Sequence, residues 1–246
     1  MASENTERLQ YIYRLQQSKL VSISHMTENL TSIRENLETF STEQKALAGE
    51  LENCTNVCRR TIRRLEKKDS MEESEEKTED GSKSLSPARK KSFLQAMRDV
   101  HDMSSSAAGN IYRISASQKH SAELLDLSVI MVKHFLWRER IFMALILGGH
   151  DNEALKQVSV RNCALGRWYD GRGKEAYSHL PAYRTLGEVH CRYHRVINEL
   201  IDRGMEGIAF SELSVELAKL ELLSQQLVGL IGQIHHHVAL LQNSPE

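Results

Sequence analysis

The sequence predicts an all-α protein, with a long N-terminal coiled-coil helical hairpin followed by a C-terminal helical bundle. Two observations carry the fold prediction. The 246 residues include 3 prolines and 13 glycines, too few turn-forming residues for an all-β fold. Apolar residues also recur at alternating intervals of three and four over long stretches, the spacing that is typical of coiled-coil helices.

The composition narrows the class of protein further. Lys and Arg number 32 against 33 Asp and Glu, so no excess of positive charge favours a nucleic-acid partner. The longest apolar run, residues 141–147, is far shorter than the roughly 20 residues that span a bilayer. The polar first residues lack a signal-peptide core. We therefore expect a cytoplasmic protein without a membrane span, in which the 4 cysteines are not a disulfide scaffold.

Residues 1–68 are predicted to form the first coiled-coil helix. Its seam is expected to consist of Met26, Leu30, Ile33, Leu37, Phe40, Leu47, Leu51, Cys54, Cys58 and Leu65. Gln44 and Thr61 fill the two remaining seam positions. Cys54 and Cys58 are interpreted as small buried seam residues, with an interchain disulfide across a parallel dimer seam as the alternative.

Residues 69–87 contain seven acidic residues and five serines, a composition that predicts a disordered linker. Residues 88–120 are predicted to form the second coiled-coil helix, which continues without a helix breaker to about residue 147. Two long helices joined by a linker predict an antiparallel hairpin. A homodimer of hairpins would form a four-helix bundle, because one hairpin alone leaves much of its apolar stripe exposed to water.

Residues 121–241 are predicted to form a compact helical bundle of their own. A short helix is expected over 151–163 and irregular, glycine-rich structure over 166–182. Two further helices are expected over about 182–203 and 208–241.

His190 and His194 are four residues apart, so their imidazoles share one helix face and can bind one metal ion. The same spacing occurs in HExxH metalloproteases, but Cys191 replaces the glutamate that would be the general base. A histidine pair alone is weak support for a metal. Cys163 and His134 strengthen the case for a metal site, although a histidine on an apolar helix face, such as His134, is more often a core residue. Three imidazoles and one thiolate make a complete tetrahedral zinc set.

These residues form a pattern that resembles the chemoreceptor zinc-binding (CZB) domain of bacteria. The pattern reads His134-x-x-Trp137, then Cys163-x-Leu165-Gly166-x-Trp168-Tyr169, then His190-x-x-x-His194. The separations of 29 residues (163 − 134) and 27 residues (190 − 163) also fit the family. The resemblance covers about residues 121–215.

The resemblance implies a zinc site made of His134, Cys163, His190 and His194, with Trp137 and Trp168 packed around it. Family members sense zinc, and some sense oxidants such as hypochlorous acid at the zinc-bound cysteine, which makes Cys163 the redox-sensitive residue. They lie at the end of soluble chemoreceptors or on diguanylate cyclases, usually as dimers. The implied partners are a second copy of the chain and a chemotaxis or cyclic-di-GMP signalling protein.

The sequence departs from better-known members of the family, because it has no cyclase domain and an acidic linker replaces the receptor's signalling tip. One alternative is a scaffold protein stapled by a structural zinc. An enzyme is not expected, since four protein ligands leave no open coordination position and no general base stands beside them. Cys191 is interpreted as a packing residue or a spare thiol, not as a fifth ligand.

Overall fold

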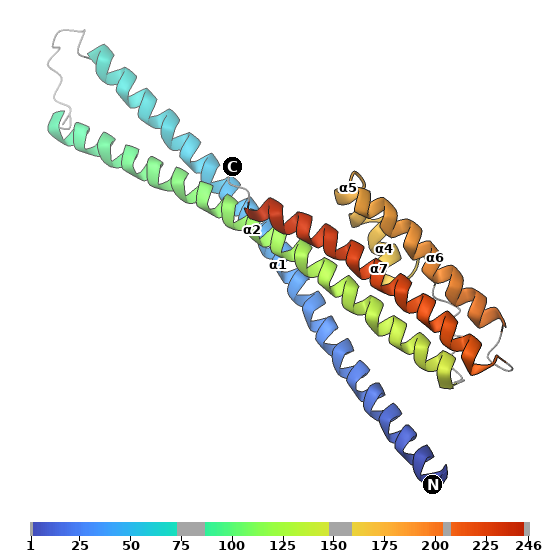
Figure 1. The fold of residues 1–246 in the computed structure, drawn as a ribbon. Coiled ribbons are helices and arrows are strands. Elements are labelled where there is room, and N and C mark those ends of the chain that lie inside the picture. The colour runs from blue at the N-terminus through green and yellow to red at the C-terminus, as the bar shows by residue number, and fades with distance from the viewer. Residues whose placement is uncertain (1, 73–86, 148–158, 204–207, 244–246) are drawn as a thin grey trace. The chain divides into compact units, whose positions relative to one another are not determined.

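The computed structural model describes residues 2–72, 87–147, 159–203 and 208–243, and throughout these residues the regular secondary structure is helical, which confirms the all-α prediction. The helices are α1 (Ala2–Glu72), α2 (Pro87–Leu147), α4 (Ala164–Asp170), α5 (Arg172–Tyr177), α6 (Pro181–Arg203) and α7 (Phe210–Asn243) (Figure 1). None of the described helices is both long and apolar enough to cross a membrane.

The two long helices follow the predicted pattern closely. α1 spans 71 residues and α2 spans 61. Pro87 is the first residue of α2, a position where the missing proline N–H removes no helical hydrogen bond. α1 runs four residues into the predicted acidic linker before it ends at Glu72. The rest of that linker, residues 73–86, lies outside the described residues.

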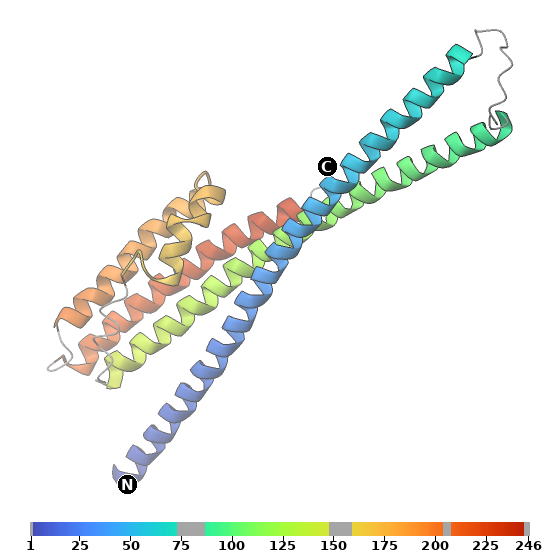
Figure 2. The ribbon, with the colours of Figure 1, turned by 180° about the vertical axis from the view of Figure 1, so that it is seen from behind.

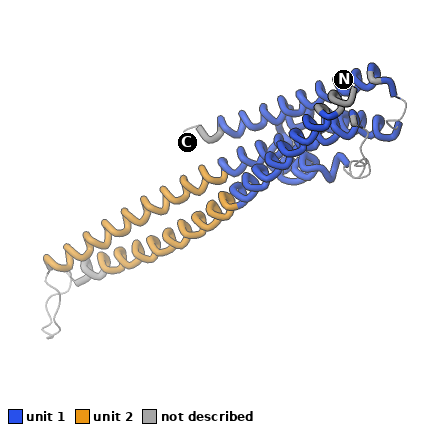
Figure 3. Tube along the Cα trace, turned by 90° about the horizontal axis from the view of Figure 1, so that it is seen from below, with its two compact units in different colours: residues 1–35, 120–246 blue, residues 36–119 orange. Residues whose placement is uncertain are grey.

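The chain divides into two compact units (Figure 3). Unit 1 comprises residues 1–35 and 120–246, and unit 2 comprises residues 36–119. Unit 2 consists of the C-terminal part of α1 and the N-terminal part of α2, lying side by side as a helical hairpin. Unit 1 holds the ends of these two helices together with α4, α5, α6 and α7.

Mostly small side chains form the seam inside the hairpin of unit 2. On α1 the buried residues recur every seven positions, at Ser41, Ala48, Thr55 and Ile62. Ser41 Oγ donates to the Ser115 carbonyl at 2.9 Å, and Ser115 Oγ donates to the Ser41 carbonyl at 2.7 Å. Each hydroxyl thus finds a buried partner on the facing helix, as buried polar groups require.

One of the two columns of the predicted seam is not buried within the single hairpin. Phe40 and Leu47 are 54% and 55% exposed, and Cys54 is exposed rather than buried. Cys58 is half-buried, with its thiol 3.7 Å from the Met97 carbonyl. One partner helix covers only part of a wide apolar stripe, so the smaller residues face α2 and the larger ones stay outside. We call the exposed set the outer column: Phe40, Leu47 and Cys54 on α1 with Phe93, Val100 and Ile114 on α2.

The core of unit 1 is built around α6 and α7, which pack side by side (Figure 2). α6 buries one face throughout its length, formed by Tyr183, Leu186, Val189, His190, Tyr193, His194, Ile197, Leu200 and Ile201. α7 contributes Leu220, Leu227, Ile231, Ile234 and Val238. Two buried histidines therefore lie on an otherwise apolar and aromatic face.

Residues 166–182 were expected to be irregular, and this prediction is wrong, because α4 and α5 occupy most of the segment. Two glycines of this segment allow neighbouring atoms to pack closely against the backbone. A Cβ on Gly166 would lie 1.8 Å from the Val160 carbonyl oxygen, and one on Gly173 would lie 2.9 Å from the Trp168 ring. Most of the helix expected over 151–163 lies outside the described residues, and residues 160–162 form a turn.

Candidate metal centre

Three helices bring the candidate ligands of unit 1 together. His134 lies on α2, and His190 and His194 lie one turn apart on the buried face of α6. Cys163 is the N-cap residue of α4, and its sulfur accepts a hydrogen bond from the Gly166 N–H at 3.1 Å. Because Gly166 packs directly against the Val160 carbonyl, the turn that presents the sulfur is tightly fixed.

Cys163, His190 and His194 form the centre of the site. Their potential ligand atoms all lie within 4.8 Å of one another. Cys163 Sγ is 3.2 Å from His190 Nε2, and the rings of His190 and His194 meet edge to face with centroids 4.8 Å apart. One sulfur and two imidazole nitrogens in such proximity are a donor set that suits zinc.

His194 supplies an independent test of whether a metal fits. Its side chain is 1% exposed, and neither ring nitrogen has a hydrogen-bond partner among the described residues. A buried polar group without a partner is unfavourable and calls for an explanation, such as a bound ion. Coordination through one ring nitrogen would provide that partner, so the residues present fit a zinc ion.

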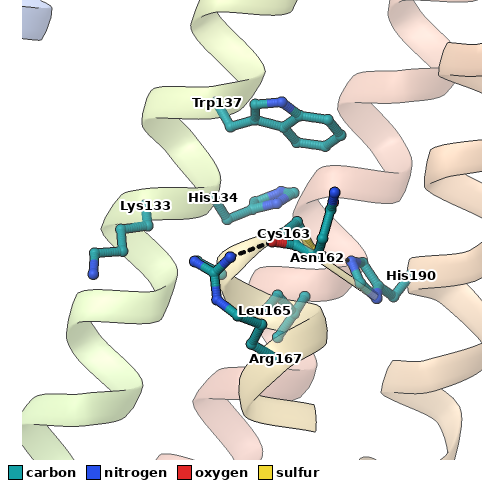
Figure 4. Close-up of a pocket in the computed structure, with 9 residues that line it drawn as sticks. Lys133, His134, Trp137, Asn162, Cys163, Leu165, Arg167 and His190 are labelled. Atoms are coloured by element: carbon teal, nitrogen blue, oxygen red, sulfur yellow. Dashed lines mark hydrogen bonds between the residues drawn. The ribbon is translucent and has the colours of Figure 1, made fainter. Parts of the chain in front are cut away.

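His134 borders the same site but is not part of this three-residue group. It lines a pocket of about 310 Å³ together with Cys163 and His190 (Figure 4). Its Nε2 is 2.9 Å from the hydroxyl of Ser224 on α7. The structure therefore places His134 beside the other three candidates, with one ring nitrogen engaged by a serine.

Ser224 is a site residue that the sequence analysis missed. It is fully buried between Leu223 and Leu227 on the apolar face of α7, and it also accepts a 3.4 Å hydrogen bond from Arg138 Nη1. A serine inside an apolar stripe was the only signal available in the sequence. That signal does not identify the partner, which lies 90 residues away along the chain.

Burial dominates the electrostatics of the histidines. Burial lowers the pKa of His134 and of His190 to about 4 and that of His194 to about 3. All three imidazoles are therefore neutral near pH 7, the form in which a ring nitrogen can bind a metal.

Burial also raises the pKa of the Cys163 thiol, against the opposing effects of the Gly166 and Leu165 N–H groups and of Arg167. In the absence of a metal the cysteine is therefore held as a neutral thiol. A nearby dication reverses this preference, since a coordinating thiol is deprotonated.

The two tryptophans lie in different surroundings. Trp137 stacks on the His194 ring with centroids 4.6 Å apart and an interplanar angle of 28°, so it covers a candidate ligand directly. Trp168 is buried and stacks on Tyr177, deeper in the core of unit 1. Cys191 is exposed although its neighbour His190 is buried, because adjacent residues on a helix point to different sides.

A helical bundle that gathers a cysteine and histidines from separate helices around one buried point has the arrangement of a metal-binding domain. Residues 134–201 match the family model of the chemoreceptor zinc-binding domain (CZB), which confirms the resemblance of this part of the chain to that family. The matched segment begins at His134 and includes Cys163, His190 and His194. No curated protein and no solved structure matches the chain.

Proposed function

We propose that the protein is a sensory or regulatory protein that detects zinc, oxidants or both through His134, Cys163, His190 and His194, and passes the signal on through its coiled coil. The observation that carries this proposal is the group formed by Cys163, His190 and His194, with ligand atoms within 4.8 Å of one another, inside a segment that matches a zinc-binding domain family. A cytoplasmic location and a role in chemotaxis or cyclic-di-GMP signalling belong to the same proposal.

The zinc ion, when bound, supplies the positive charge that keeps the Cys163 sulfur a thiolate. The protein's own residues hold that sulfur in place, with the Gly166 N–H donating to it and His190 beside it. The Cys163 sulfur is thus both the proposed ligand atom and the oxidisable atom of the site. Its oxidation removes the negative charge of the donor and weakens metal binding.

A continuous helix offers a route for the signal. α2 is one helix from Pro87 to Leu147, and it carries His134. A change in how His134 is held alters the packing of α2 against α6 and α7, and small shifts of packed helices are a known form of switching. The signal would leave through the coiled-coil part of α2.

The outer column favours a second copy of the chain as a partner. It leaves large apolar side chains exposed on both helices of unit 2, including Phe93 at 56% and Val100 at 58%. Pairing two hairpins along this column would cover these side chains in a four-helix bundle.

Two other functions are weighed against the sensor. An enzyme is disfavoured, because four protein ligands leave no coordination position open for water or substrate. A structural zinc staple would use the same ligands but would not exchange its metal. Zinc that a chelator of moderate affinity removes and returns reversibly supports the sensor, whereas zinc released only on unfolding supports the staple.

Elemental analysis of the purified protein tests the site itself. We expect about one zinc per chain, lost in Cys163→Ala and kept in Cys191→Ala, the matched control with an exposed thiol. A zinc-free wild type after purification with added zinc, or loss of zinc in Cys191→Ala alone, would overturn the ligand assignment.

A further inference from the structure

Unit 1 contains a second cavity, of about 390 Å³, next to the metal centre. α1, α2, α4 and α5 all contribute to its wall. It shares Ala164, Lys133 and Arg167 with the pocket that contains Cys163, and Figure 4 shows the last two on the wall of that pocket. None of the residues that line this second cavity is a candidate zinc ligand.

Four cations line the cavity, and each comes from a different helix: Arg34 from α1, Lys133 from α2, Arg167 from α4 and Arg172 from α5. The lining contains a single carboxylate, that of Asp126, which lies 3.4 Å from Arg34 Nε. Because the four cations come from four helices, their grouping does not simply reflect one basic helix face. It concentrates positive potential in one concave place, where a bound anion would relieve the repulsion.

Arg34 strengthens this interpretation because of where it lies. Arg34 is only 8% exposed. It occupies the same heptad position of α1 as the buried residues Ser41 and Ala48, which follow it at intervals of seven. Burying a guanidinium is unfavourable unless it is paired and hydrogen-bonded. Two ion pairs, of Nε with Asp126 at 3.4 Å and of Nη2 with the exposed Glu35 at 3.0 Å, hold Arg34 at the wall of the cavity, so the position of this cation is fixed before a ligand binds.

Apart from Thr31, the rest of the lining is apolar. Val129, Ile130 and Trp168 form part of the wall. The volume is several times the roughly 30 Å³ that one water molecule occupies, so the cavity has room for an organic group beside an anionic one. A few placed charges within an apolar lining are typical of small-molecule sites.

We propose that this cavity binds a small molecule that carries a phosphate group, with the phosphate held by Arg34, Arg167, Arg172 and Lys133 and the organic part against Trp168. Guanidinium groups match the oxygens of a phosphate in forked pairs of hydrogen bonds. The Gly171-Arg172-Gly173-Lys174 segment lacks the spacing of a phosphate loop, so side chains rather than backbone amides would provide the recognition.

Isothermal titration calorimetry of the full chain, as purified with its zinc, tests the proposal with phenyl phosphate, inorganic phosphate and phenol. We expect saturable binding of both phosphates, weakened by added salt, and none of phenol. Tighter binding of phenyl phosphate would assign the site to phosphate esters, and equal binding would assign it to inorganic phosphate. Zinc content is measured before and after, so that metal lost to phosphate is not mistaken for binding.

Matched variants locate the binding. Arg172→Gln and Arg167→Gln change exposed cavity residues and should each weaken phosphate binding about tenfold. Arg184→Gln removes an exposed arginine of α6 outside the cavity and should leave binding unchanged. No saturable binding below about 10 mM, equal losses in all three variants, or phenol binding as well as phenyl phosphate would overturn the proposal.

Discussion

His134 Nε2 lies 2.9 Å from Ser224 Oγ, and this hydrogen bond joins α2 to α7 beside the metal centre. Both side chains are buried, with His134 5% and Ser224 0% exposed. Histidines that bind a metal usually have their other ring nitrogen hydrogen-bonded to a neighbouring group, which fixes the orientation of the ring. Ser224 is the described residue that takes this part for His134.

Replacing Ser224 by alanine should therefore weaken zinc binding. Loss of an outer partner of a metal-binding histidine typically reduces affinity about 10- to 100-fold, and we expect the lower end, because His134 would be one ligand of the four proposed. Competition against a chromogenic chelator measures the change. Ser214→Ala, an exposed serine on the same helix, should bind zinc as the wild type does. Unchanged or tighter binding in Ser224→Ala would contradict the positioning role.

The stability of the zinc-free protein should depend on pH in a defined window. In the unfolded chain these histidines take up protons near pH 6.5, but burial lowers the pKa of His134 and of His190 to about 4 in the folded protein. Between these values the unfolded state binds more protons. The free energy of unfolding should therefore fall as the pH drops from about 6.5 to about 4, by up to about 1.4 kcal/mol per pH unit for each histidine.

Urea titrations of the chelator-treated protein at several pH values measure this dependence. His194→Leu should make it less steep, because burial also lowers the pKa of His194, to about 3, and its share of the dependence is lost while those of His134 and His190 remain. His236→Gln, which changes an exposed histidine of α7, should preserve it. A wild-type stability that stays constant from pH 7 to pH 4.5 would be inconsistent with neutral buried histidines.

The outer column should control dimerisation. Leu47→Glu places a charge in the exposed apolar column and should shift the protein to monomers in sedimentation at micromolar concentration. The helix content should be unchanged, because Leu47 is already 55% exposed in the single chain. Ala46→Glu, at the neighbouring exposed position off the column, is the control. A Leu47→Glu variant that sediments as the wild type does would show that the outer column is not the dimer interface.

Oxidation should release the metal. A zinc-bound thiolate remains open to small oxidants, so hypochlorous acid at about one equivalent should release zinc to an indicator dye. A thiol reductant should restore binding if oxidation stops at the sulfenic acid or at a disulfide. Cys191→Ala is run in parallel. If both proteins release zinc but only the wild type rebinds it after reduction, Cys191 is the resolving thiol. Zinc retained under several equivalents of oxidant would reject the oxidant-sensing branch.

Helix positions and the candidate ligand pattern were accessible from the sequence. The apolar repeat in α2 predicted a helix over about 88–147, and the structure has it over Pro87–Leu147. The spacing of His190 and His194 placed both on one face of α6, where they are buried. Such features are local, because the 3.6-residue period of a helix fixes which residues share a face whatever packs against it.

Which face receives a partner is decided only by the tertiary structure. Phe40 and Ser41 are neighbours in sequence, yet the small serine faces α2 and the large phenylalanine stays exposed. The pairing of His134 with Ser224 and the convergence of four cations at one cavity join residues from different helices. No local period encodes these contacts, since they depend on how close packing brings distant segments of the chain together.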